Sequence, residues 1–290
     1  MNILITGSAG QLGRELNDSA PDGHVLAAHD RTTLDLADDH SMRAVLGKAR
    51  PNLIINAGAF TQVDAAEENR DVAAAVNGKA VAQLAEYAQL EGARVIHFST
   101  DFVFHGDQTT PYSTTAATRP INAYGESKLQ GEQALLATIA QQCVLIRTAW
   151  VYSAYGNNFV HTMLRLLRER ESVIVVSDQV GSPTWAAGLA EFVWQVVARD
   201  SMHGIYHWTD AGVTSWSDFA VAIPDIALEL GLLDRQIPIR PVSSAEYPTA
   251  ARRPHYSVLD KSATLAGGFE PRHWRHTLHD MLTHLATEAS

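Results

Sequence analysis

Three residues near the middle of the sequence have the types and the spacing of a site that moves a proton. Tyr124 and Lys128 are four positions apart, so they share one face if the segment is helical. A free tyrosine is a poor acid near neutral pH, with a pKa of about 10, and a neighbouring ammonium lowers that pKa by favouring the phenolate. Thr100 could hold the reacting oxygen by a hydrogen bond. The pattern indicates proton transfer to or from an oxygen; the alternative is a surface tyrosine and lysine on an ordinary helix.

Thr100 is predicted to lie at the edge of a parallel sheet where ligands bind. The apolar run 93–98 predicts a buried strand, and Ser99 and Thr100 fall at its carboxyl end. In open parallel sheets, ligands bind at the carboxyl ends of the strands. A helix is predicted over residues 124–139, so the strand and the helix together must position the proton-transfer residues.

A glycine-rich turn opens the chain. Residues 2–6 form a short apolar run, Gly7-x-x-Gly10-x-x-Gly13 follows, and a helical pattern begins at Arg14. The glycines permit close approach of the backbone, and the N–H groups at the start of a helix attract a phosphate. This order of strand, turn and helix predicts a dinucleotide-binding site.

The next predicted strands supply further candidates for cofactor binding. The strand 24–29 ends at Asp30 and Arg31. An acid there would bind the adenosine ribose of NAD, whereas an arginine could hold the 2′-phosphate of NADP, so the sequence leaves the cofactor open; the alternative is a charged loop tip. The other candidates are residues that could meet the adenine or approach the cofactor with their backbone: Asp35, Leu36, Ala57, Gly58, Ala59 and Phe60.

Strands and helices alternate over the first 150 residues, which predicts an α/β protein with a Rossmann-type doubly wound parallel sheet. We expect a dinucleotide-binding domain over residues 1–150, to which part of 184–215 returns. Residues 151–290 would form a smaller, mainly substrate-binding α/β region, with a cationic loop over 241–254. Asn77 lies within a predicted helix over 71–90, where an asparagine is usually only tolerated.

Composition narrows the class of protein. The chain has 290 residues and a net charge of −10, which argues against nucleic-acid binding. Its single cysteine, Cys143, lies in an apolar run and is expected in the core. The histidines have no metal-site spacing, and no signal peptide or membrane span is recognisable. We expect a cytoplasmic protein with no membrane partner.

Eight sequence blocks together resemble the extended short-chain dehydrogenase/reductases, and within them the reductases of dTDP-linked 4-keto sugars. The resemblance covers essentially the whole chain. The glycine and Tyr/Lys blocks are typical of the superfamily, and the later blocks indicate the sugar-nucleotide reductases. The blocks are Gly7-x-x-Gly10-Gln-x-Gly13, Asn56-Ala-Gly-Ala-Phe-Thr-x-Val-Asp64, Ser99-Thr-Asp-Phe-Val-Phe104, Tyr124-Gly-x-x-Lys128-x-x-Gly131-Glu132, Arg147-Thr-x-Trp150-Val-Tyr152, Gly156-Asn-Asn-Phe159, Asp178-Gln-x-Gly-Ser-Pro-Thr184 and Tyr247-Pro-Thr-x-Ala-x-Arg253-Pro254.

The resemblance implies a role for each part of the site. Tyr124 would protonate the sugar C4 oxygen as hydride arrives, Lys128 would bind the nicotinamide ribose and lower the tyrosine pKa, and Thr100 would bind the same oxygen. The turn residues Gly7, Gly10, Gln11, Leu12 and Gly13 would cradle the pyrophosphate, and 57–60 would lie beside the cofactor. The implied substrate-binding residues are Thr100, Asp101, Trp150, Asn157 and Arg253.

The same resemblance implies the reaction and its partners. The substrate would be a nucleotide sugar, dTDP-4-dehydro-β-L-rhamnose, and the cofactor NADPH with NADH tolerated. Some relatives dimerise through Mg²⁺ held by two acidic residues; Glu15 matches the first, but Ala187 stands at the second place. We therefore expect no metal, and a monomer or a homodimer.

Three alternatives share this fold. One is a sister reductase of another dTDP-4-keto sugar, with the same catalytic residues. Another is a non-catalytic regulatory subunit, which commonly loses part of the catalytic set; here Thr100, Tyr124 and Lys128 are all present. The third is a sugar epimerase, against which the later blocks argue.

Overall fold

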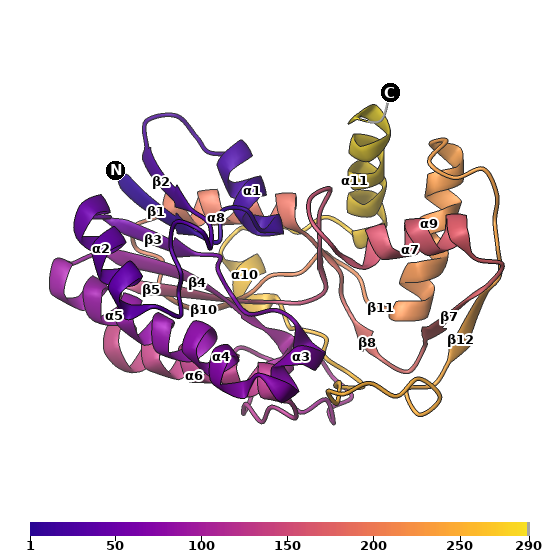
Figure 1. Ribbon diagram of the computed structural model, residues 1–290, viewed down its shortest axis with the longest axis horizontal. Helices are drawn as coiled ribbons and strands as arrows, with labels where there is room; N and C mark the ends of the chain where they lie inside the picture. Colours follow the sequence, from indigo (N-terminus) through magenta and orange to yellow (C-terminus); the bar gives the residue numbers. More distant parts are fainter. Residues whose placement is uncertain (289–290) are drawn as a thin grey trace.

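The computed structural model describes residues 1–288 and is built around a six-stranded parallel sheet (Figure 1). The strands lie in the order β10-β5-β4-β3-β1-β2, and every neighbouring pair is parallel. Their bounds are β1 (Asn2–Thr6), β2 (Val25–His29), β3 (Leu53–Asn56), β4 (Arg94–Thr100), β5 (Cys143–Thr148) and β10 (Gly204–His207). β2 lies on one side of β1 and β3 on the other, so the strand order changes direction at β1 although all the strands are parallel. Ligands bind at such a topological switch point. The predicted doubly wound sheet is confirmed.

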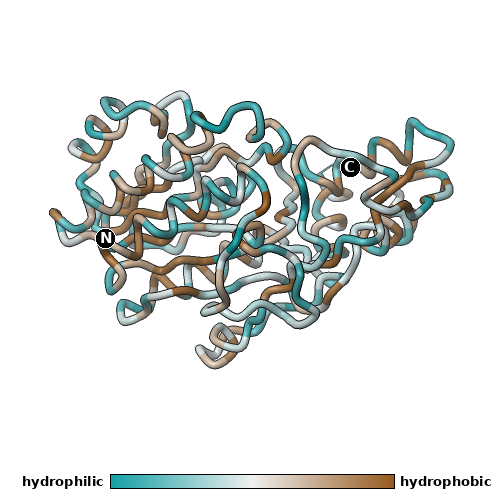
Figure 2. The backbone as a smooth tube through the Cα atoms, turned by 90° about the horizontal axis from the view of Figure 1, so that it is seen from below, coloured by the Kyte–Doolittle hydropathy of each residue, from teal (hydrophilic) through white to brown (hydrophobic). Residues whose placement is uncertain are grey.

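Helices cover both faces of this sheet because the strand residues alternate between two apolar cores. Ile3 and Ile5 of β1 pack toward α1 (Gln11–Asp18) and α8 (Ala186–Val197). Leu4 packs on the opposite face, against α2 (Asp39–Ala49), α5 (Ala80–Glu91) and α6 (Ala123–Ile139). Figure 2 shows these strands in the brown of hydrophobic residues, with teal along the outer loops. Burial on both faces is typical of parallel sheets.

The helix expected over 71–90 is divided in the structure. It comprises α4 (Arg70–Ala74), a π-helical turn, η1 (Ala75–Lys79), and α5, after the short α3 (Val63–Glu68). Asn77 lies in the π turn and is buried. Gly131 of α6 permits close packing there, because a Cβ at Gly131 would lie 2.2 Å from the Asn77 carbonyl oxygen. π turns of this kind are frequent at functional sites.

A smaller lobe lies at the other end of the molecule (Figure 1). Its core joins α7 (Phe159–Glu169), α9 (Trp216–Glu229), α11 (Trp274–Glu288) and the parallel pair β7 (Val173–Val176) and β12 (Ile239–Val242). The expected loop over 241–254 is therefore wrong at its start, because Pro241 and Val242 pair with β7. The remaining short elements are η2 (Asp101–Val103), β6 (Val151–Tyr152), β8 (Val180–Gly181), β9 (Thr184–Trp185), β11 (Thr214–Ser215) and α10 (Ser262–Ala266).

Between the elements of this smaller lobe, the chain returns to the large sheet. Helix α8 packs on one face of the sheet, and β10 adds a sixth strand beside β5. Cys143 is buried in the core at the start of β5. Within residues 1–288, no helix is long and apolar enough to cross a membrane.

Candidate active site

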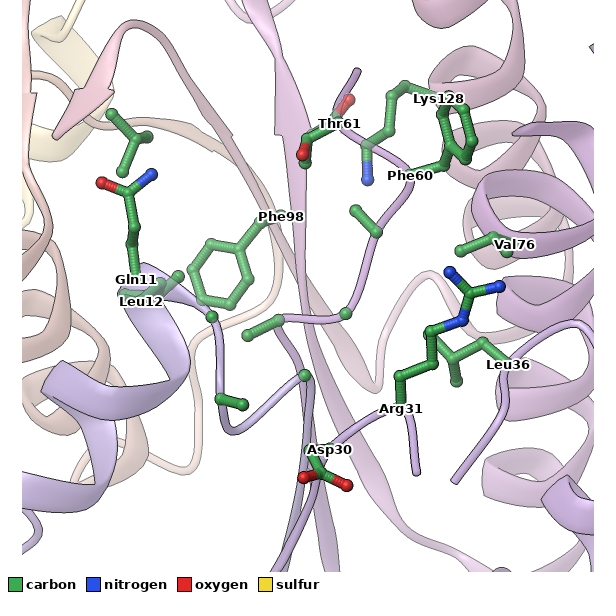
Figure 3. A pocket seen from close by; sticks show the side chains of 18 of the residues that line it. Gln11, Leu12, Asp30, Arg31, Leu36, Phe60, Thr61, Val76, Phe98 and Lys128 are labelled. Atoms are coloured by element: carbon green, nitrogen blue, oxygen red, sulfur yellow. The ribbon is translucent and has the colours of Figure 1, made fainter. Parts of the chain in front are cut away.

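A cleft opens at the carboxyl ends of β1, β3 and β4, with a volume of about 400 Å³ (Figure 3). That volume lies within the range of small-molecule and cofactor sites, about 300–1,000 Å³. All but one of the residues predicted to bind the cofactor line it. These are Gly7, Gly10, Gln11, Leu12, Asp30, Arg31, Asp35, Leu36, Ala57, Gly58, Ala59, Phe60, Tyr124 and Lys128.

The exception is Gly13, which packs against the backbone of the glycine turn at Gly7. A Cβ at Gly13 would lie 2.2 Å from the carbonyl oxygen of Gly7, so only glycine fits there. Gly7 has a φ of +66°, and its carbonyl accepts a hydrogen bond from the Gly10 N–H at 2.9 Å. The amino end of α1, capped by Gly10, borders the cleft. Its first N–H groups have no partners within the helix, so the turn fits an anionic group such as a pyrophosphate.

Asp30 and Arg31 have different environments. The Asp30 carboxylate accepts hydrogen bonds from the N–H groups and hydroxyls of Thr32 and Thr33, which hold its pKa below the usual range. Its oxygen Oδ1 is therefore engaged in the turn that follows β2. The Arg31 side chain extends across the opening of the cleft toward Val76 (Figure 3). Arg31 and the second carboxylate oxygen of Asp30, Oδ2, have no hydrogen-bond partner among the described residues, so either group can meet a ligand.

Helix α6 begins where it must to place Tyr124 and Lys128. The Asn122 side chain caps it by accepting a hydrogen bond from the Gly125 N–H at 2.7 Å. Glu67 also accepts one from the Ala123 N–H at 2.8 Å. Tyr124 thus lies in the first turn and Lys128 in the second, and both line the cleft. The predicted face shared by the two residues is present in the structure.

The environment of Tyr124 keeps its phenol protonated. Burial raises its pKa to about 12; a hydrogen bond with Thr100 acts in the lowering direction, and the charge of Asp101 acts in the raising direction. The net change in this pKa is upward, because desolvation of the phenolate outweighs the hydrogen bond with Thr100. Tyr124 is therefore a neutral acid at physiological pH. That Lys128 acts on this pKa in the lowering direction stays a prediction.

Lys128 is buried, with 3 % of its surface exposed, and its ammonium group extends into the cleft near Phe60 (Figure 3). Burial lowers its pKa to about 8, and the charge of Glu132 opposes that change. Glu132 is itself bound by Arg147 of β5 through two hydrogen bonds, at 2.9 and 2.7 Å. Lys128 can therefore lose its proton at only slightly alkaline pH.

Asp101 lies directly behind Thr100. The Thr100 hydroxyl donates to Asp101 Oδ1 at 3.0 Å and accepts from the Phe102 N–H at 3.1 Å. Burial raises the pKa of Asp101 to about 6, and hydrogen bonds from Ser257 and Thr100 oppose this change. Neither Thr100 nor Asp101 lines the cleft itself; they form its support behind Tyr124.

Asn77 has a larger structural role than the sequence suggested. Its side chain accepts a hydrogen bond from the Phe60 N–H at 2.9 Å and donates to the Phe60 carbonyl at 3.0 Å. It also donates to the hydroxyl of Ser127, next to Lys128, at 2.9 Å. Asn77 thereby fixes the loop that lines the cleft against the helix that carries Tyr124 and Lys128.

The remaining predicted substrate residues lie outside the cleft. Trp150 has a φ of +49° and stacks on Trp216, with 3.7 Å between ring centroids. Asn157 is exposed in the loop before α7. Arg253 is bound by Asp64 through two hydrogen bonds, at 3.0 and 2.7 Å.

Ten further residues line the cleft that were not among the predicted cofactor-binding residues, although Ser99 was already expected at the ligand-binding end of its strand. Several follow a predicted residue directly or stand at a strand end, so the same rule could have found them. Leu189 belongs to α8, far along the chain, and no local signal indicates it. The ten are Ala9, Leu34, Thr61, Val72, Val76, Phe98, Ser99, Thr148, Val151 and Leu189.

Glu15 lies on α1 and accepts a hydrogen bond from the Ser153 hydroxyl at 2.6 Å. Burial raises the pKa of this carboxyl, and the hydrogen bond from Ser153 opposes that change. Among residues 1–288, no group of three or more His, Cys, Asp or Glu side chains could hold a metal ion. The contact that the structure shows for Glu15 is this hydrogen bond, which joins α1 to the segment after β6.

The doubly wound sheet, the glycine turn and the Thr100, Tyr124 and Lys128 set define an extended short-chain dehydrogenase/reductase. The chain belongs to the family described as RmlD substrate binding domain, whose model matches residues 1–287. The resemblance drawn from the sequence is confirmed.

Individual relatives support this assignment along the full length of the chain. A dTDP-4-dehydrorhamnose reductase of Aggregatibacter actinomycetemcomitans is 38 % identical over 284 residues, covering 95 % of this chain and 96 % of that protein. A dTDP-4-keto-6-deoxy-D-glucose reductase of Streptomyces niveus is 39 % identical over 274 residues, covering 93 % of both chains. The crystal structure of dTDP-4-dehydrorhamnose reductase from Bacillus anthracis in complex with NADP superposes with a TM-score of 0.91 at 36 % identity, covering 97 % of this chain and 98 % of that one.

Proposed function

We propose that the protein reduces the C4 ketone of dTDP-4-dehydro-β-L-rhamnose to dTDP-β-L-rhamnose with NADPH, a step of dTDP-rhamnose biosynthesis. The observation that carries this function is the complete catalytic set at one edge of the sheet. Tyr124 and Lys128 line the cleft, and Thr100 is close enough to Tyr124 to act on the pKa of its phenol in the lowering direction. The family and its reductases at 38–39 % identity supply the substrate class. A shared fold alone would not license this function, because function depends on the site.

Each residue of the set has a distinct task. The nicotinamide cofactor, when bound, supplies the hydride. Tyr124, protonated because its pKa is raised to about 12, donates its proton to the developing alkoxide at C4. The Thr100 hydroxyl, which donates to Asp101 Oδ1 in the protein alone, turns to donate to the same oxygen and orients it. The ammonium form of Lys128 favours the phenolate that Tyr124 leaves behind.

The cleft fits a phosphorylated dinucleotide. The amino end of α1 meets the pyrophosphate, and Ala57, Gly58, Ala59 and Phe60 approach with their backbone. Arg31, whose guanidinium lines the cleft beside Asp30, binds the 2′-phosphate of NADPH. Asp35 and Leu36 lie at the adenine end of the cofactor. NADH is tolerated because its other contacts do not involve the 2′-phosphate that it lacks.

The nucleotide sugar lies between the two lobes. Thr100 and Asp101 meet its reacting end, Trp150 and Asn157 bind the sugar, and Arg253 binds near its nucleotide end. Trp150 and Asn157 adjoin the smaller lobe, whereas Arg253 is held beside the larger one by Asp64. Substrate binding therefore requires groups from both lobes. We further propose that the protein is cytoplasmic and is a monomer or a homodimer.

A sister reductase of another dTDP-4-keto sugar is the second candidate. The relative named dTDP-4-keto-6-deoxy-D-glucose reductase is as similar to this chain as the dehydrorhamnose reductase. The catalytic residues would be the same in both reactions, so only the residues around the sugar distinguish them.

The test follows NADPH absorbance with dTDP-4-dehydro-L-rhamnose, which an upstream epimerase generates in the same solution. We expect rapid oxidation by the wild type. Tyr124→Phe should keep cofactor binding and lose about a hundredfold or more of the turnover, because it lacks the acid. Wild-type turnover in this variant would refute the role of Tyr124.

A second arm of the same assay tests the substrate. If the protein binds NADPH but does not oxidise it, the assigned sugar is wrong. Faster turnover of dTDP-4-keto-6-deoxy-D-glucose than of the rhamnose precursor would favour the sister activity.

A further inference from the structure

Three polar side chains form a row across the otherwise apolar face of the sheet, next to the cleft. Thr6, Asn56 and His97 stand on the adjacent strands β1, β3 and β4, in register with one another. None of the three has more than 1 % of its surface exposed. Buried polar groups are costly unless they are hydrogen-bonded, so the partners of this row define its function.

The row is part of a continuous hydrogen-bonded chain. The Gly58 N–H donates to Thr6 Oγ1 at 3.1 Å, and the Thr6 hydroxyl donates to Asn56 Oδ1 at 2.6 Å. The Asn56 amide nitrogen lies 2.9 Å from His97 Nδ1, and His97 Nε2 lies 3.5 Å from Lys128 Nζ. The chain therefore links the backbone of the cleft loop to the catalytic lysine.

The direction of the hydrogen bonds is fixed at the Gly58 end. A backbone N–H can only donate, so the Thr6 oxygen accepts and its single hydrogen goes to Asn56 Oδ1. The Asn56 NH₂ group then donates to His97 Nδ1. A neutral imidazole that accepts at Nδ1 carries its hydrogen on Nε2, and this hydrogen faces Lys128.

The charges around the lysine agree with a neutral His97. Burial lowers the pKa of His97 well below its usual range, and the charge of Lys128 lowers it further. From its own helix, Lys128 also faces Glu132, whose charge is shared with Arg147 of β5. Tyr124, one turn earlier, is a neutral phenol.

We propose that His97 is a positioning residue whose Nε2–H, held toward Lys128 by Asn56 and Thr6, favours the amine over the ammonium form of that lysine. An N–H group that faces an ammonium leaves two donors opposed, whereas it can donate to the lone pair of an amine. This inference rests on the proposed role of Lys128. A lysine that readily releases its proton can return one to the phenolate of Tyr124 after each turnover, and can take up another through the cleft that it lines.

The variant Thr6→Val tests the direction of the chain without changing the surroundings of Lys128. Valine has the shape of threonine but no hydroxyl, so nothing holds Asn56 Oδ1 toward residue 6. The amide can then turn so that its oxygen accepts a hydrogen bond from His97 Nδ1–H, which leaves a lone pair at His97 Nε2 facing the ammonium. We expect the pKa of Lys128 to rise by about one unit, a tenfold change in its proton dissociation.

The measurement is an NMR titration of protein labelled with ¹³C at the lysine ε-carbons, without cofactor or substrate. The chain has only four lysines, at positions 48, 79, 128 and 261, and Lys128→Arg identifies the signal. Thr264→Val is the matched control, since Thr264 is equally buried but bonds the His207 carbonyl instead. An unchanged or lowered pKa of Lys128 in Thr6→Val would overturn the proposal.

A second variant and a second signal keep the test decisive if Thr6→Val folds poorly. Asn56→Leu removes the group that sets the imidazole tautomer, and should raise the pKa of Lys128 in the same direction. The ¹⁵N shifts of His97 should show hydrogen on Nε2 in the wild type; hydrogen on Nδ1 would contradict the proposal. Because neither signal requires turnover, the result is independent of the substrate assay.

Discussion

Arg253 binds both carboxylate oxygens of Asp64, a residue 189 positions earlier in the chain, at 3.0 and 2.7 Å. The same guanidinium donates to the hydroxyl of Thr249 and to the carbonyl of Ala251, and the Ala251 N–H donates to Asp64. The ion pair holds the pKa of Asp64 below its usual range. The loop that carries Arg253 is therefore fixed to the start of α3, three residues beyond Thr61 of the cleft.

Arg253→Lys should weaken substrate binding more than it destabilises the fold. Lysine keeps the charge but cannot form the two-branched contact with a carboxylate or phosphate. We expect the KM for the nucleotide sugar to rise about tenfold, as for the loss of one charged hydrogen bond. Stability should change by less than about 1 kcal/mol, because the pair is partly exposed. Steady-state kinetics and urea unfolding check both; an unchanged KM would contradict the role of Arg253.

The cofactor side of the site was predictable because its signals are local. The turn from Gly7 to Gly13 stands between a strand and a helix, and the residues that follow the predicted strands 2–6, 24–29 and 93–98 line the cleft. The spacing of Tyr124 and Lys128 needed only the period of a helix. These features depend on neighbours in the sequence, so the pattern alone determines them.

The supporting contacts depend on tertiary packing and were not predictable. Asn77 looked like a tolerated helix residue, and only the fold brings it to Phe60. The raised pKa of Tyr124 follows from burial, which no spacing reveals. The partner of Arg253 lies on an element far away in the chain, where the sequence gives no pairing rule.

Arg31→Ala should change the choice of cofactor. The guanidinium extends over the cleft opening, while the oxygen Oδ1 of Asp30 is engaged by Thr32 and Thr33. Loss of a charge-assisted contact to the 2′-phosphate should raise the KM for NADPH about tenfold or more. The KM for NADH, which lacks that phosphate, should stay within about twofold.

Measuring kcat/KM with NADPH and with NADH gives the ratio of the two values, which is the cofactor preference. Arg43→Ala on the nearby helix α2 serves as a control for the loss of one positive charge. Equal losses with NADPH and NADH in Arg31→Ala would show that Arg31 does not read the phosphate.

Gly181→Ala should displace Trp150. A Cβ at Gly181 would lie 2.8 Å from the indole ring, which is already stacked on Trp216. The ring cannot move toward Trp216, so it must shift within the substrate region. We expect the KM for the nucleotide sugar to rise severalfold while cofactor affinity is unchanged, because a small misplacement of binding groups is costly. Gly188→Ala, where a Cβ meets open space, is the control; equal effects of the two variants would contradict the prediction.

Asp101 should make the stability of the protein depend on pH between about 4 and 6. Its pKa is raised from 3.8 to about 6, chiefly by burial. In this window the folded protein keeps a proton that the unfolded chain has lost, so the contribution of Asp101 to stability falls as the pH rises and is constant above about pH 6. The shift of about two units corresponds to about 3 kcal/mol.

Asp101→Asn isolates this effect, since the amide stays neutral and its oxygen can still accept the hydrogen bond from Thr100. The difference in unfolding free energy between variant and wild type, measured in urea, should grow in favour of the variant from pH 4 to pH 6. Asp210, whose pKa is raised to about 7 by burial, contributes equally to both proteins and cancels in the difference. A difference that does not vary with pH would mean that Asp101 titrates alike in the folded and unfolded chains, and that its carboxylate is stabilised in place by Ser257 and Thr100.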